Sequence, residues 1–319
     1  MTARRRLVTA VALLFAAAVA GCGFGPGSSS EGTATLTVTR DYGTQALVGA
    51  SDHDPAASET VIRMLDREAE ITTRYGGGFV QSIDGVSGTE RGGRRYDWFF
   101  YVNGVESPVG AADVRVHGGD RIWWDYRDWT SAMRVPAVVG SWPEPFAQSS
   151  ATGDRRPIRV ECSTAGEACQ TVADRLADVG VHASVDRGKE KRSRGSDALR
   201  LLVGPWSEVR SDGAVDDLRG GPATNGVFAT FKGPIGGAYD LIALDPTAEP
   251  STDLGSRAGL VAALHEGDGP PTWIVTGSKP SAVLRAARLL DAKALRDRYA
   301  VAAPAHGHPL ALPVDGGRE

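Results

Sequence analysis

Two of the three cysteines stand close enough in the sequence to react with each other. Cys162 ends an apolar segment that predicts a strand, and Cys169 follows in the first turns of a predicted helix, with six residues between them. A loop of this length closes with an acceptable Cα separation, and thiols outside the cytoplasm oxidise. We expect a structural disulfide between Cys162 and Cys169; free thiols or a redox pair are the alternatives.

Aromatic side chains crowd two short stretches, where they could recognise a flat ligand. They are Trp98, Phe99, Phe100, Tyr101, Trp123, Trp124, Tyr126 and Trp129. Because alternate residues of a strand point to opposite faces, one face forms core and the other exposes large rings. Such a face marks a ligand or partner surface, unless the second half of the chain and residues 142–146 cover it. The candidate ligand-binding residues are Tyr75, Tyr101, Trp123 and Tyr126.

No arrangement of residues in the sequence is typical of an enzyme. The serines lie in no Gly-x-Ser-x-Gly motif, and the acidic residues are spread along both halves of the chain. The glycines at 76–78 precede a predicted strand, whereas phosphate cradles use a helix N-terminus. They favour a tight turn, with close approach of a ligand as the alternative. We therefore expect no catalytic residue and no metal site.

The elements that must position the aromatic residues follow from hydrophobic periodicity. Strands are predicted at residues 33–40, 46–48, 79–83, 96–102 and 121–126, with a helix at 58–70. Asn103-Gly104 is typical of a type I′ hairpin turn. Two strands, a helix and three or more strands are the order of a small β-grasp-like α+β domain, which we place at residues 34–147.

The second half predicts a different unit. Apolar segments predict strands at 158–161, 181–185, 199–203, 226–231, 239–244, 259–264 and 272–276, with helices at 166–179 and from Pro280. We expect a mixed-sheet α/β sandwich domain of unknown function at residues 156–303. A polar linker at 148–155 would join the two domains, and residues 304–319 would form a loose tail.

The N-terminus carries the pattern of an export signal. Arg4, Arg5 and Arg6 precede an apolar run at residues 7–20 that is too short to span a bilayer comfortably. Val19-Ala20-Gly21-Cys22 follows at once and resembles the lipobox of bacterial lipoproteins. The resemblance implies that residues 1–21 are a signal peptide and that Cys22 carries acyl chains such as palmitate. Residues 22–33, rich in Gly and Ser, would then be a flexible tether at the extracytoplasmic face of the cell membrane.

The aromatic blocks of the first half also resemble a known family. Residues 37–43, 74–85, 97–104 and 119–126 are similar to the transcobalamin-like C-terminal domain, a family of undefined general function. In animal transcobalamin and intrinsic factor, the related domain caps a corrinoid against a helical toroid, and this sequence has no toroid. The resemblance implies a corrinoid as ligand, with a toroid-domain protein or an energy-coupling-factor transporter as partner.

Charge excludes one further class of function. The chain has 35 Lys and Arg against 39 Asp and Glu, so it lacks the basic footprint of a general nucleic-acid binder. We expect a lipid-anchored, non-enzymatic protein that binds a small planar ligand or a partner, accessory to cobalamin or vitamin uptake. The alternative is a cell-envelope protein-interaction module with no small-molecule ligand.

Overall fold

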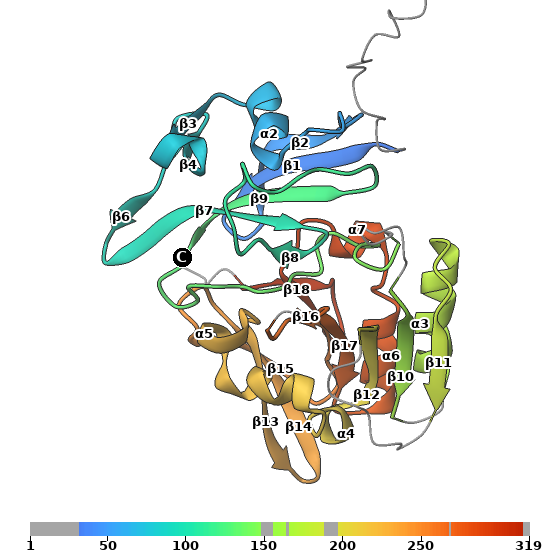
Figure 1. Ribbon diagram of the computed structural model, residues 1–319. Helices are drawn as coiled ribbons and strands as arrows, with labels where there is room; N and C mark the ends of the chain where they lie inside the picture. Colours follow the sequence, from blue (N-terminus) through green and yellow to red (C-terminus); the bar gives the residue numbers. More distant parts are fainter. Residues whose placement is uncertain (1–31, 148–155, 164–165, 188–196, 268, 315–319) are drawn as a thin grey trace, which may run out of the picture.

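The computed structural model describes residues 32–147, 156–163, 166–187, 197–267 and 269–314 (Figure 1). The predicted signal peptide at 1–21, Cys22, most of the tether at 22–33 and the linker at 148–155 lie outside these ranges. The described residues form a mixed α and β structure that is mainly sheet, with several separate sheets. None of the helices within them is long and apolar enough to cross a membrane.

The first half is built on a six-stranded sheet with the order β2-β1-β9-β7-β6 and β8 paired to β7. Its strands are β1 (Ala34–Arg40), β2 (Gln45–His53), β6 (Thr89–Arg91), β7 (Arg94–Val102), β8 (Val105–Glu106) and β9 (Arg121–Asp128). β1 runs parallel to β9, and the other pairs are antiparallel. Asn103 and Gly104 join β7 to β8 with φ values of 53° and 81°, as a type I′ turn requires.

One face of this sheet is covered by α2 (Val61–Glu68) and by a small sheet of β3 (Ile71–Arg74), β4 (Phe79–Ile83) and β5 (Val86–Ser87). The apolar side chains of α2 recur at helical spacing, and Val61, Met64 and Leu65 are buried. The helix is shorter than the predicted 58–70: it begins after Thr60 and ends at Glu68, where Ala69 turns to an extended conformation. A 3₁₀ turn, η1 (Tyr75–Gly77), joins β3 to β4.

The second half contains a seven-stranded mixed sheet with the order β11-β10-β12-β17-β16-β18-β19. Its strands are β10 (Ile158–Cys162), β11 (Ser184–Arg187), β12 (Leu199–Pro205), β16 (Gly259–Leu264), β17 (Thr272–Gly277), β18 (Ala300–Ala303) and β19 (Leu310–Leu312). The strands from β11 to β17 are parallel, and β16, β18 and β19 continue the sheet with antiparallel pairing. Helices α3 (Glu167–Asp178) and α6 (Pro280–Ala287) pack on one face, whose core includes Val172 and Val283.

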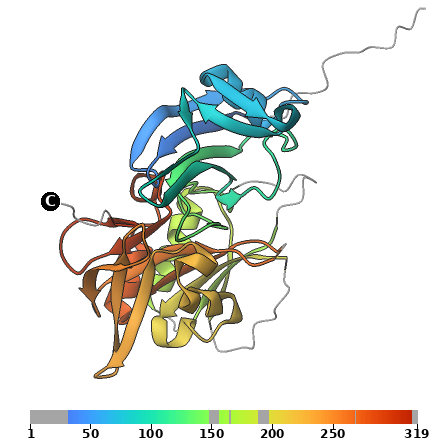
Figure 2. The same ribbon diagram turned by 90° about the vertical axis from the view of Figure 1, so that its left-hand side faces the viewer.

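The opposite face of that sheet carries shorter elements. They are α4 (Trp206–Val209), η2 (Gly213–Gly220), α5 (Pro222–Asn225) and a three-stranded sheet of β13 (Ala229–Ile235), β14 (Ala238–Leu244) and β15 (Pro250–Gly255); α7 (Ala292–Leu295) precedes β18. In Figure 2 the hairpin of β13 and β14 extends from the end of the molecule remote from the first half.

Two aromatic residues in the chain after β9 pack with the second half. The rings of Trp142 and Phe146 lie 5.9 and 5.1 Å from that of Trp273 on β17, between centroids. Residues 142–146 therefore fill the core of the second half, which corrects the idea that they cover the aromatic face of the first. Burial of two large aromatic side chains in an existing core explains this choice.

Part of the expected tail is also structured. β19 pairs with β18 through Leu310 and Leu312, and the amide of Val314 donates to the carbonyl of Leu244 at 3.0 Å. The expectation of a loose tail from 304 is thus corrected for residues 310–314, because strand pairing satisfies their backbone groups.

Candidate functional site

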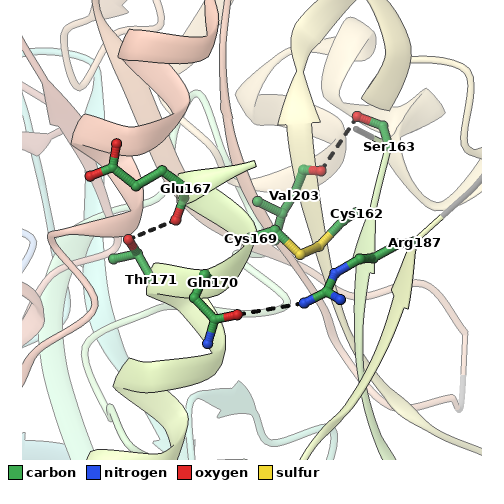
Figure 3. The surroundings of a disulfide bond; sticks show 8 residues. All are labelled: Cys162, Ser163, Glu167, Cys169, Gln170, Thr171, Arg187 and Val203. Carbon is green, nitrogen blue, oxygen red and sulfur yellow. Dashed lines mark hydrogen bonds between the residues drawn. A yellow bond between two sulfur atoms is a disulfide. The ribbon is translucent and has the colours of Figure 1, made fainter. Parts of the chain in front are cut away.

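The two neighbouring cysteines form the expected disulfide (Figure 3). Their Cα atoms lie 6.0 Å apart, within the usual range for such a bond. Cys162 at the end of β10 and Cys169 in α3 are both buried, so the bond ties the first turns of the helix to the sheet. The disulfide is an internal constraint of the second half.

Two of the four candidate ligand-binding residues are covered by the second half. Tyr101 on β7 and Trp123 on β9 are 0% and 2% exposed. The ring of Tyr299, just before β18, lies 5.8 Å from Tyr101 and 5.3 Å from Trp123, between centroids. Neither side chain offers a surface to a ligand in this arrangement, and the alternative in which the second half covers this face is the one observed.

A buried hydrogen-bond network accompanies these rings at the junction. The carboxylate of Asp125 on β9 accepts hydrogen bonds from the hydroxyls of Thr39 and Tyr299 at 2.6 and 2.9 Å. It also accepts from the backbone amides of Tyr42 and Gly43, each at 3.1 Å. Burial raises the pKa of Asp125, and the hydroxyl and amide donors oppose that rise.

Arg127 is a second buried polar residue on the same face of β9 as Asp125. Its guanidinium is fully buried, lies 3.8 Å over the ring centroid of Phe99 and donates to the carbonyl of Ala132 at 2.7 Å. Burial raises the pKa of Tyr101 and of Tyr299, so both phenols stay protonated and can donate. This face of the sheet therefore works as a joint between the two halves.

Tyr126 lies on the opposite face of β9, which faces the core of the first half. Its ring is 9% exposed and stacks on Tyr96 of β7, with centroids 6.0 Å apart and an interplanar angle of 19°. Its hydroxyl donates to the carbonyl of Ser87 at 2.9 Å. The stacked pair sits at the margin of the core of the first half, and Trp98 lies behind it, 5.2 Å from Tyr126 between centroids.

A cleft of about 630 Å³ opens beside this tyrosine pair, a size typical of small-molecule sites. We call it the Tyr126 cleft; its lining residues are Arg40, Asp41, Gly85, Val86, Ser87, Gly88, Thr89, Arg91, Tyr96 and Tyr126. The sheet supplies the floor of the cleft. Arg40 on β1 and Trp98 on β7 are the register partners of Tyr126, so they lie beside it on the two neighbouring strands. The segment 85–89 supplies a wall.

The charged side chains of the Tyr126 cleft differ in how they are held. The guanidinium of Arg40 donates twice to the amide oxygen of Gln45, at 2.8 and 2.5 Å, and lies 3.6 Å from the carboxylate of Asp41. Arg91 is exposed and, within the described part of the chain, has no side-chain hydrogen bond or ion pair. Burial raises the pKa of Tyr126, the charge of Asp97 adds to the rise, and the charge of Arg91 opposes it.

Tyr75 lies apart from the cleft. It begins η1 with a φ of 54°, is 87% exposed and has its ring 6.4 Å from that of Phe79, between centroids. The structure therefore does not bring the four predicted residues together: two are at the joint, one is in the cleft and one is on a surface turn. Sequence reasoning missed Arg40, Arg91 and Tyr96, of which only Tyr96 had a signal, its spacing of two from Trp98.

Among the described residues, no group of three or more His, Cys, Asp or Glu side chains is arranged to hold a metal ion.

Comparisons with known proteins give a match to a family over part of the chain and weak structural likenesses. No curated protein matches the chain. A solved structure from Ruminococcus gnavus ATCC 29149, described as a candidate metal-binding protein, aligns with 31% of this chain and 98% of its own, at 16% identity and a TM-score of 0.25. Residues 58–128, which hold α2, the small sheet and β6 to β9, match the domain of unknown function DUF4430, the family that includes transcobalamin-like C-terminal domains.

Proposed function

We propose that this protein is a lipid-anchored extracytoplasmic binding protein whose Tyr126 cleft receives a small planar ligand. The observation that carries the proposal is the cleft of about 630 Å³ bounded by the stacked rings of Tyr96 and Tyr126. Flat aromatic walls favour flat ligands, because stacking adds to the burial of apolar surface. The cleft also lies largely within the segment that matches DUF4430.

The proposed location follows from the N-terminal sequence. The Arg4-Arg5-Arg6 cluster, the apolar run at 7–20 and Cys22 support a cleaved signal peptide and acylation of the cysteine. Each buried methylene of an acyl chain contributes about 0.8 kcal/mol, so two or more chains hold a protein at a membrane. Mass spectrometry of protein extracted from membranes should find an acylated Cys22 as the first residue. An intact, unmodified N-terminus would contradict the anchor.

The ligand class rests on the resemblance to transcobalamin-like domains. This resemblance supports a corrinoid as the ligand, with one edge of its ring entering the cleft. It also supports an accessory role in cobalamin or vitamin uptake through an energy-coupling-factor transporter. In this proposal the first half is a β-grasp-like domain and the second a mixed-sheet α/β sandwich. The second half braces the back of the binding sheet, since its Tyr299 packs on Tyr101 and Trp123.

Equilibrium dialysis of the full chain in detergent against cyanocobalamin and cobinamide tests the ligand. We expect retention by the wild type, loss in Tyr96→Ala and no change in Tyr75→Ala, because Tyr75 lies outside the cleft. Circular dichroism spectra check that both variants are folded. Absence of retention by the wild type would remove the corrinoid, and equal retention by both variants would remove the cleft as its site.

A second candidate function, docking of a protein partner, is favoured by an exposed apolar patch. Tyr75, Phe79 and Val109 are 87%, 41% and 50% exposed. Their two loops touch, since a Cβ on Gly110 would lie 2.5 Å from the carbonyl oxygen of Gly78. If this patch docks a transporter component or a toroid-domain protein, the partner should co-purify with the wild type from detergent extracts and be lost in Tyr75→Ala. Co-purification unchanged by Tyr75→Ala would contradict this use of the patch.

A further inference from the structure

The lining of the Tyr126 cleft is cationic although the chain as a whole is acidic. Two guanidinium groups, of Arg40 and Arg91, face one carboxylate, of Asp41, whereas the formal net charge of the chain is −4. Arg40 and Asp41 lie 3.6 Å apart and largely balance each other. The charge of Arg91 is left over, and it belongs to the cleft.

The backbone around Arg91 explains why this charge lies at the mouth of the cleft. Arg91 is the last residue of β6 and pairs with Arg94 across a two-residue turn, Gly92-Gly93, whose φ values are 58° and 76°. So tight a turn fixes the direction of β6 and β7 and keeps Arg91 beside the sheet face that carries Tyr96 and Tyr126. The charge of Arg91 acts on the Tyr126 hydroxyl, because it lowers the pKa that burial raises.

The other charged groups close to the tyrosine pair either are already paired or do not line the cleft. Arg94 lies 6.0 Å from the ring centroid of Tyr96 and forms an ion pair with the buried carboxylate of Asp128. Asp97 lies behind Gly88, where a Cβ would come within 2.9 Å of its Oδ1, and is not among the lining residues. The carboxylate of Asp97 acts on Tyr126 in the opposite sense to Arg91, but from outside the lining of the cleft.

We propose that the cleft selects planar ligands that carry an anionic oxygen group, with the rings on Tyr96 and Tyr126 and the anion on the guanidinium of Arg91. This inference rests on the proposed function and names the ligand class of the same site. A guanidinium offers a planar fork of donors that fits a carboxylate, sulfonate or phosphate. Because the side chain of Arg91 has no hydrogen bond or ion pair among the described residues, it can form a new charge-assisted pair without breaking one of them.

Matched probes separate the anion from the ring. Isothermal titration of the full chain in detergent would compare indole-3-acetate with indole-3-acetamide, and naphthalene-2-sulfonate with naphthalene-2-sulfonamide. Within each pair the ring is the same and only the charge differs. We expect the anion to bind at least about tenfold more tightly, since a hydrogen bond to a charged group supplies that much.

Two variants assign the preference to a residue. Arg91→Gln removes the charge but keeps a polar side chain and should abolish the preference for the anion, while Arg159→Gln, at an exposed position on β10, should preserve it. Partition of the probes into detergent is the same for all three proteins and cancels in the comparison. The exposed position of Arg91 keeps Arg91→Gln from disturbing the fold.

The outcomes distinguish the failure of this inference from the failure of the proposed function. If both members of each pair bind equally to the wild type and Tyr96→Ala removes binding, the cleft is a ligand site and the anion preference is wrong. If the preference is present but survives Arg91→Gln, the assignment to Arg91 is wrong. If no probe binds, the planar-ligand site itself is overturned together with the inference.

Discussion

Removal of the Tyr299 hydroxyl should loosen the joint between the two halves by a measurable amount. In Tyr299→Phe, Asp125 loses a buried donor that lies 2.9 Å from its carboxylate. A hydrogen bond to a charged group is worth about 1.5–3 kcal/mol. The hydroxyl of Tyr101, which donates to Tyr299 at 3.3 Å, also loses its acceptor. Together these losses predict a decrease of about 2–4 kcal/mol in the free energy of unfolding.

Urea unfolding followed by tryptophan fluorescence and by far-ultraviolet circular dichroism measures this decrease. The wild type should unfold in one transition by both probes, because one hydrophobic core contains Tyr42 and Trp123 from the first half with Phe228 and Tyr299 from the second. The control is Tyr75→Phe, whose exposed ring predicts a change within about 0.5 kcal/mol. A decrease in the free energy of unfolding below about 0.5 kcal/mol in Tyr299→Phe, or two separate transitions in the wild type, would refute the idea that these contacts join the two halves.

Three further predictions concern the same framework. Replacing both Cys162 and Cys169 by Ser should lower the free energy of unfolding by about 2.5 kcal/mol in urea titrations, because the disulfide closes a short loop; an unchanged midpoint would count against a structural bond. Gly43→Ala should destabilise the fold more than Gly85→Ala, although both glycines have a φ of 77°. A Cβ at position 43 would overlap the carbonyl oxygen of Asp297, whereas a Cβ at position 85 would have no atom within 4 Å. Equal melting temperatures of the two variants would contradict this contact. Burial raises the pKa of Asp125 above 3.8, so the native state binds the proton of this carboxyl more tightly than the unfolded state does. The wild type should therefore gain stability relative to Asp125→Asn as the pH falls through the raised pKa toward 3.8. A difference between their urea midpoints that stays constant across this window would contradict the raised pKa.

Features that depend on neighbouring residues were predictable from the sequence. The alternation in residues 33–40 predicts a strand, and β1 (Ala34–Arg40) is that strand. Asn103-Gly104 predicts a type I′ turn, and both residues adopt positive φ. The spacing of Cys162 and Cys169 predicts a disulfide, which is present. In each case the chemistry is complete within a few residues, so no knowledge of the rest of the chain is needed.

Features that depend on distant contacts were not predictable. Tyr101 and Trp123 have the types and spacing of ligand-binding residues, but Tyr299, 198 residues after Tyr101, covers both. Period two along β9 places Trp123 and Tyr126 on opposite faces, and the sequence does not say which face meets the second half. Arg91 reaches the cleft through the register of a hairpin, which leaves no mark in residue type.

The proposed function requires ligands to enter the Tyr126 cleft and not the aromatic face that meets the second half. Backbone amide chemical shifts of the ¹⁵N-labelled full chain, recorded while naphthalene-2-sulfonate is added, test it most directly. We expect the largest shifts on Ser87, Gly88, Thr89 and Arg91, which line the cleft. Shifts that cluster at Tyr101, Trp123 and Tyr299, or on none of these residues, would contradict it.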